Sequence, residues 1–114
     1  MKISKELIKG STVLLVSNLL KEKPLYGYEM IKAMEIKSQG LFQWKEGTLY
    51  PILHGLESEG YLSSYWETPS AGRKRKYYEI TKKGTKELSR REKEWKTFSD
   101  TVNLSLGGIQ WMGN

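Results

Sequence analysis

The spacing of the apolar residues changes twice along this chain, and these changes limit the fold more than any other feature of the sequence. Up to Gly60 the apolar positions recur every three or four residues, which is typical of helices that bury one face. The segments 61–66 and 76–81 are short and rich in aromatic and β-prone residues, which indicates two strands. From Lys82 the helical spacing returns and continues to Leu106. We therefore expect helices interrupted by one β-hairpin.

Three helices are predicted before the hairpin, over residues 4–22, 26–36 and 45–59. Ser4 can cap the first helix, and Pro24 ends it. In the second, Gly27 either allows a close approach of two helices or is simply tolerated near a helix start.

The third helix has the most complete one-sided pattern, followed at once by Gly60, which suits a left-handed C-terminal cap. Its apolar positions are Leu49, Ile52, Leu53 and Leu56. Its start stays open. With Thr48 as the cap, Pro51 falls in the first turn and no hydrogen bond is lost, whereas a start near Glu46 costs one.

The two strands are joined by the turn-rich segment 68–72, and the last helix is predicted over residues 82–106. Gly107 and Gly108 end this helix. The order of elements predicts an α+β fold, mainly α: a winged helix-turn-helix with a long C-terminal dimerisation helix. We assign residues 1–81 to the winged domain, 82–108 to the dimerisation helix in the same compact unit, and 109–114 to a tail.

Composition excludes several classes of function. The 114 residues contain no cysteine and one histidine, so thiol nucleophiles, disulfides, cysteine-based zinc sites and paired-histidine metal sites are excluded. No glycine-rich phosphate loop follows a strand, and the acids alternate with bases as on solvated helix faces. We expect no enzyme activity, no cofactor and no metal. No apolar run approaches bilayer length, so a cytoplasmic protein without membrane contact is expected.

The positive charge is concentrated in the hairpin. Between Arg73 and Lys83 there are six basic residues and one acid, a net charge of +5 in a chain whose total is +6. A wing charged in this way can follow a phosphate backbone, because each neutralised phosphate releases a condensed counterion. A hairpin whose charges only improve solubility is the alternative.

The third helix presents small, uncharged or hydrogen-bonding side chains on the face opposite its leucines, which can enter a major groove. Thr48, Tyr50 and His54 are therefore the predicted base readers, although Tyr50 could instead pack in the core and His54 could have no special role. The predicted phosphate contacts are Lys32, Lys45, Arg73, Lys74 and Arg75.

These residues together resemble the PadR-like family of transcriptional regulators. The resemblance runs over about residues 10–106, and its combined spacing is specific although each piece alone is weak. It is carried by Tyr26-Gly27-Tyr28-Glu29, Gly47-Thr48-Leu49-Tyr50-Pro51, Leu53, Leu56-Glu57, Gly60, Trp66, Arg73 to Tyr78, Ile80-Thr81, Gly84 and Leu88. The length is similar to that of the short members with one C-terminal helix.

The resemblance implies a homodimeric repressor of an inverted-repeat operator in double-stranded DNA. In some short members a tryptophan of each last helix flanks a planar aromatic molecule, which would release the repressor; this implies a pore at Trp95 and Phe98. Plain dimer packing of Trp95 is the alternative, because Leu88 and Val102 share its apolar stripe and are expected at the dimer interface. The rival function is a protein-interaction module whose wing binds an acidic protein partner without any ligand response.

Overall fold

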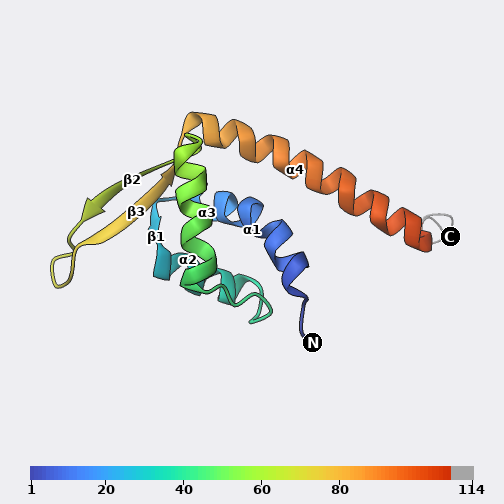
Figure 1. The fold of residues 1–114 in the computed structure, drawn as a ribbon, viewed down its shortest axis with the longest axis horizontal. Helices are drawn as coiled ribbons and strands as arrows, with labels where there is room; N and C mark the ends of the chain where they lie inside the picture. The colour runs from blue at the N-terminus through green and yellow to red at the C-terminus, as the bar shows by residue number, and fades with distance from the viewer. Residues whose placement is uncertain (109–114) are drawn as a thin grey trace.

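The computed structural model describes residues 1–108 and contains four helices, a three-stranded sheet and a final π-helical turn within that range. The predicted tail, residues 109–114, lies outside the described residues. The helices α1, α2 and α3 pack together at one end of the sheet, while the hairpin and α4 extend away from them in different directions (Figure 1). The predicted fold class, a mainly α winged helix-turn-helix with a long C-terminal helix, is confirmed.

The first helix, α1 (Lys5–Leu20), is capped by Ser4, whose hydroxyl accepts a hydrogen bond from the Leu7 N–H. The second half of α1 enters the core, where Val16 and Leu20 are buried. Helix α2 (Gly27–Lys37) begins where the Tyr26 N–H donates to the Glu29 carboxylate. The side chain of Glu29, the third residue of the helix, thus satisfies one backbone N–H at the helix start that the helix itself leaves without a partner.

Helix α3 spans Glu46–Ser58, with Lys45 at the cap position, so the structure settles the open question about its start. Pro51 lies beyond the first turn, and the Gly47 carbonyl receives no ladder bond from it. At the other end the Tyr61 N–H donates to the Leu56 carbonyl across Gly60, whose φ of +83° is the left-handed cap expected from the sequence.

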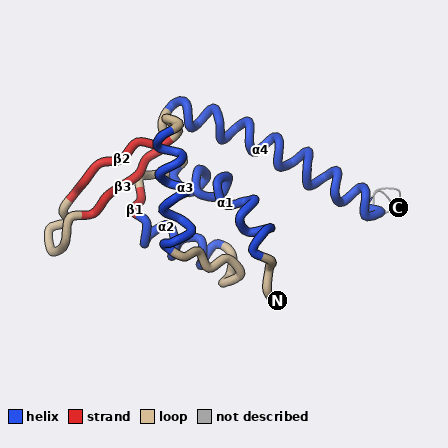
Figure 2. The backbone as a smooth tube through the Cα atoms, viewed as in Figure 1, coloured by secondary structure: helices blue, strands red, loops and turns tan. Residues whose placement is uncertain are grey.

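The sheet consists of β1 (Leu25–Tyr26), β2 (Leu62–Glu67) and β3 (Arg75–Ile80), in the spatial order β1-β3-β2 and antiparallel throughout (Figure 2). Each hairpin strand is within one residue of its predicted position. Strand β1 was not predicted. It adds its two residues to the edge of β3, opposite Tyr77 and Tyr78, and so ties the start of α2 to the wing.

Helix α4 (Lys82–Asn103) is capped at its N-terminus by Thr81, whose hydroxyl accepts from the Gly84 N–H and donates to the Gly60 carbonyl. Gly84 is required here, because a Cβ at this position would overlap the backbone carbonyl of Tyr61. The α-helix ends three residues earlier than predicted. It is followed by the π-helical turn η1 (Leu104–Gly108), within which Gly107 has a non-helical φ of +95°.

One apolar core joins the three-helix unit to the inner face of the sheet. Tyr78 of β3 is its largest fully buried side chain. Its members are Val16, Leu19, Leu20, Leu25, Met30, Met34, Trp44, Leu49, Leu53, Leu56, Leu62 and Tyr78. This core fixes the positions of α3 and of the base of the hairpin relative to each other.

Candidate nucleic-acid interface

The outward face of α3 is small, uncharged and exposed. Leu49, Leu53 and Leu56 are buried on the inner face. At 100° per residue the opposite face is centred on Gly47, Pro51 and His54, with Thr48 at one edge and Gly55 nearby. All five are exposed, and the space around both glycines is empty to 4 Å. The surface has room for close approach by another molecule.

Tyr50 lies at the edge of this face rather than at its centre. It is half-buried and packs partly on the core. A Cβ on Gly27 would lie 2.5 Å from the Tyr50 hydroxyl oxygen, so Gly27 is where α2 and α3 approach closely. Burial, with the nearby Glu46 carboxylate, raises the pKa of the Tyr50 phenol. The shift moves the phenol further from ionisation, and its hydroxyl can donate a hydrogen bond at neutral pH.

A groove of about 630 Å³ separates α3 from the hairpin. Four consecutive cations line it, and none of the described residues in its wall is acidic. Because like charges repel, such a surface is stabilised when an anion enters it. The wall consists of Tyr26, Gly27, Tyr50, His54, Trp66, Arg73, Lys74, Arg75, Lys76 and Tyr78.

Three of the four cations have an aromatic ring within reach. Lys74 lies over the Trp66 ring with its Nζ 5.6 Å from the centroid, and the Arg75 guanidinium lies 4.5 Å from the Tyr26 centroid. Lys76 lies over Tyr78 at 5.3 Å. Cation–π contacts of this length hold long side chains near one orientation without neutralising them.

Glu57 of α3 attaches the hairpin to the helix. Its carboxylate accepts a hydrogen bond from the Ser64 hydroxyl of β2, and its other oxygen lies 3.7 Å from Lys76 Nζ of β3. Both hairpin strands are therefore connected to α3 through a single side chain.

The structure brings most of the predicted DNA contacts to this groove, but not all. Arg73, Lys74, Arg75, Tyr50 and His54 line it, whereas Thr48, Lys45 and Lys32 do not. Lys45 is exposed at the start of α3, and Lys32 is exposed on α2 with its Nζ 5.6 Å from the Tyr28 ring. Sequence reasoning did not assign Tyr26, Trp66 or Lys76 to the site. Their place depends on strand register, which pairs Trp66 with Lys76.

A second, more apolar groove of about 820 Å³ lies between α1 and α4. Trp95 and Phe98 line it with their ring centroids 5.9 Å apart, and both remain exposed, at 44% and 57%. Val102 is also exposed. Leu88 differs, because it is only 2% exposed within this single chain. Little of its surface is left for a second chain, and its place in the dimer interface stays a prediction.

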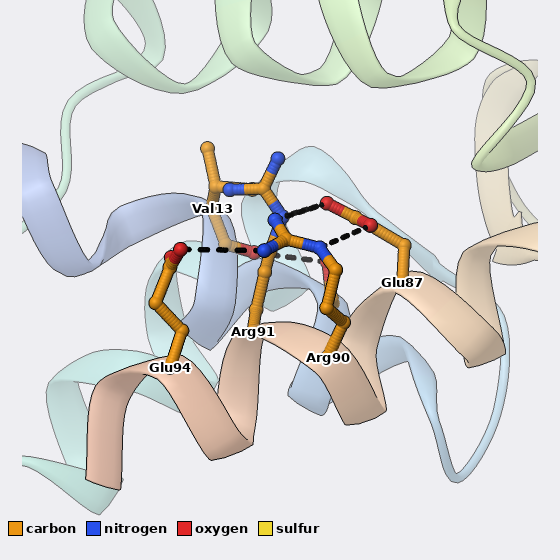
Figure 3. Close-up of polar contacts among 6 residues, drawn as sticks. Val13, Glu87, Arg90, Arg91 and Glu94 are labelled. Carbon is orange, nitrogen blue, oxygen red and sulfur yellow. Dashed lines mark hydrogen bonds and ion pairs between the residues drawn. The ribbon is translucent and has the colours of Figure 1, made fainter. Parts of the chain in front are cut away.

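A charged cluster on α4 borders this second groove. Arg90 donates to Glu87 through two nitrogens at 2.9 Å and reaches Glu94 at 3.2 Å, while Arg91 lies 2.8 Å from Glu87. Figure 3 shows these four side chains beside Val13 of α1. The hydrogen bonds from Arg90, together with the charges of both arginines, lower the pKa of Glu87. Glu87 therefore remains ionised and holds both arginines along α4.

No helix of residues 1–108 is long and apolar enough to cross a membrane. Over the same range, no three His, Cys, Asp or Glu side chains come together as a metal site.

An uncharged helix face beside a cationic hairpin groove, on a helix-turn-helix core, is the arrangement of a DNA-binding winged-helix protein. Comparison with known sequences identifies the family. Residues 16–90 match the PadR-like family of transcriptional regulators, and the chain belongs to that family. Its members are transcriptional regulators rather than enzymes, and this chain is accordingly a DNA-binding regulator.

Individual relatives cover almost the whole chain. An uncharacterised protein of Lysinibacillus sphaericus is 33% identical over 108 residues, which is 95% of this chain and 99% of that protein. A transcriptional regulator from Clostridium thermocellum has a structure similar to this one with a TM-score of 0.81 and 36% identity, covering 89% of this chain and 95% of its own. The structure of a PadR family regulator from Eggerthella lenta is similar with a TM-score of 0.79 and 36% identity, covering 89% of this chain and 86% of its own.

Proposed function

We propose that this chain is a homodimeric repressor that binds an inverted-repeat operator in duplex DNA. The observation that carries the proposal is the joint surface formed by α3 and the hairpin. An uncharged helix face suited to a major groove adjoins a groove walled by Arg73, Lys74, Arg75 and Lys76. In this arrangement α3 reads base edges while the hairpin contacts the flanking backbone. We expect the protein to act in the cytoplasm, where its DNA would lie.

The distal half of α4 supports a two-fold assembly. Trp95, Phe98 and Val102 are exposed on one face there, Leu106 of η1 continues that face, and Leu7 of α1 is 66% exposed beside the same groove. Exposed apolar residues that gather on one face usually mark a protein–protein contact. A second copy of the chain would cover them and would present two α3 helices to successive major grooves, about 34 Å apart.

We also propose that a planar aromatic molecule binds between the two copies and releases the repressor from DNA. The apolar groove of about 820 Å³ with Trp95 and Phe98 in its wall supports a ring-shaped ligand. Such a ligand would act by favouring one separation of the two α3 helices, and only to the extent that it binds the two dimer shapes unequally. If Trp95 only packs against its partner, its fluorescence will not respond to a panel of planar aromatic dyes.

Selection of duplexes from a random pool tests the operator proposal. We expect the enriched sequences to form an inverted repeat with half-sites about one helical turn apart. Sedimentation at micromolar concentration should give a dimer. An enriched sequence without two-fold symmetry, or a monomer, would contradict the proposal.

A protein-interaction module is the alternative. It is favoured only by the cationic groove, which could equally accept an acidic peptide. Unrelated duplex DNA separates the two functions, because at low salt it competes for a DNA-binding wing. A module that binds only protein would ignore the competitor.

A further inference from the structure

Trp66 is the most exposed of the tyrosine and tryptophan side chains in the wall of the groove between α3 and the hairpin. It belongs to β2, and 59% of its surface is accessible. An indole ring left in water is unfavourable because its apolar area stays hydrated. Nothing in the proposed reading of DNA by α3 requires this ring.

The exposure of Trp66 follows from the direction in which the hairpin extends from the helices. Leu62, Ser64 and Trp66 share the face of β2 that points toward α3, because side chains alternate along a strand. Leu62 is buried in the core and Ser64 is bonded to Glu57, but Trp66 lies farther along, where the hairpin extends beyond the helices (Figure 1). The chain thus directs the ring toward the groove without providing a core for it.

The immediate neighbours of the ring are cations. Lys74 Nζ lies 5.6 Å from the ring centroid, and Lys76 is its cross-strand partner in the register of β2 and β3. The next residue, Glu67, is opposite Arg75 in the strand register, and its side chain lies on the face of β2 opposite to that of Trp66. An exposed indole ring flanked by positive charges is complementary to a ligand in which anionic groups alternate with an apolar ring. The deoxyribose-phosphate backbone of DNA has this pattern.

We propose that the Trp66 indole packs against a deoxyribose of bound duplex DNA while Lys74 moves from the ring to the adjacent phosphate. The inference rests on the proposed DNA-binding function and adds an apolar contact to it. The cation–π contact keeps Lys74 beside the ring before DNA arrives, so less side-chain freedom is lost on binding. In the complex the Lys74 ammonium contacts the phosphate, and the deoxyribose occupies the place over the indole ring that the ammonium has left.

The test separates this apolar contact from the ionic ones. We would measure the affinity of the full chain for a labelled mixed-sequence duplex over a series of salt concentrations. Trp66→Ala should weaken binding about tenfold at every salt concentration, because apolar area is lost but no phosphate contact is. The log–log salt slope should therefore stay that of the wild type. Trp66→Phe, which keeps an aromatic face, should recover most of the affinity.

Tyr65→Ala is the matched control. Tyr65 is the neighbouring exposed aromatic residue of β2, but it stacks on Tyr77 on the opposite face of the hairpin, with centroids 5.7 Å apart. We expect its removal to leave affinity within about twofold of wild type. Thermal melting of each variant confirms that the fold is retained.

The possible results are distinguishable. An unchanged affinity for Trp66→Ala overturns the inference and leaves the proposed function intact. A shallower salt slope for that variant also overturns it, since the ring would then act only by positioning Lys74. If the wild type itself does not bind duplex DNA, the proposed function fails and the inference fails with it.

Discussion

Replacing Lys74 and Arg75 together by alanine should flatten the salt dependence of DNA binding. Each phosphate contact contributes about 0.9 to the slope of log affinity against log salt. Lys74 is exposed, while Arg75 is half-buried over Tyr26, so between one and two contacts are lost per chain. For a dimer the slope should become shallower by about 1.8 to 3.6. Between about 50 and 200 mM salt, the wild type should then lose roughly 10- to 150-fold more affinity than the variant.

Fluorescence anisotropy of a labelled duplex over that salt range measures the slope. The matched control is Lys86→Ala with Lys93→Ala, which removes the same charge from exposed positions of α4. Both lie on the side of α4 opposite Leu88 and Trp95, as 100° per residue requires. The control should keep the wild-type slope. Equal slopes for the wild type and the Lys74–Arg75 variant would refute the assignment of the hairpin to the phosphate backbone.

Three further predictions concern packing and pH. Gly84→Ala should destabilise the fold by about 3 kcal/mol or more in chemical denaturation, because its Cβ overlaps the Tyr61 backbone, which cannot move independently; an unchanged midpoint would contradict this. Gly27→Ala meets only the end of the Tyr50 side chain, so thermal melting should show a smaller loss of about 1 kcal/mol, and a loss as large as that of Gly84→Ala would contradict it. The folded-state pKa of Glu87 is lowered, so its contribution to stability is present above the ordinary carboxylate pKa and is lost as pH falls through the folded value. Glu87→Gln should therefore be less stable than wild type at neutral pH and equally stable in acid; a difference independent of pH would exclude this explanation.

The sequence was sufficient for the helices and the hairpin because each buries one face and therefore repeats its apolar residues at a fixed spacing. Strand β1 has two residues, too few to show any period, and it forms only because the edge of β3 is available to it. The predicted end of α4 differs from the observed end for another reason. Gly107 has the positive φ expected of a helix-ending glycine, but the α-helix already ends at Asn103, and the apolar and polar residues 104–106 carry no signal that separates a π-helical turn from an α-helix.

The candidate site was predictable where charge alone decided it. Lys74 and Arg75 were identified from a run of basic residues, whereas the place of Trp66 depends on which face of β2 turns toward α3. The heptad spacing placed Leu88 with Trp95 and Val102, yet the base of α4 packs on its own chain while its distal part extends from it (Figure 1). The spacing of apolar residues along one helix predicts which residues share a face, but it does not show which part of that face the rest of the same chain covers.

Mapping backbone amide shifts by NMR during titration with duplex DNA tests the central claim most directly. We expect the largest changes in residues 45–55 of α3 and 66–76 of the hairpin, and little change on the face of α4 that carries Lys86 and Lys93. Changes confined to α1 and α4, or spread evenly over the surface, would show that the helix face and the cationic groove are not where this protein holds DNA.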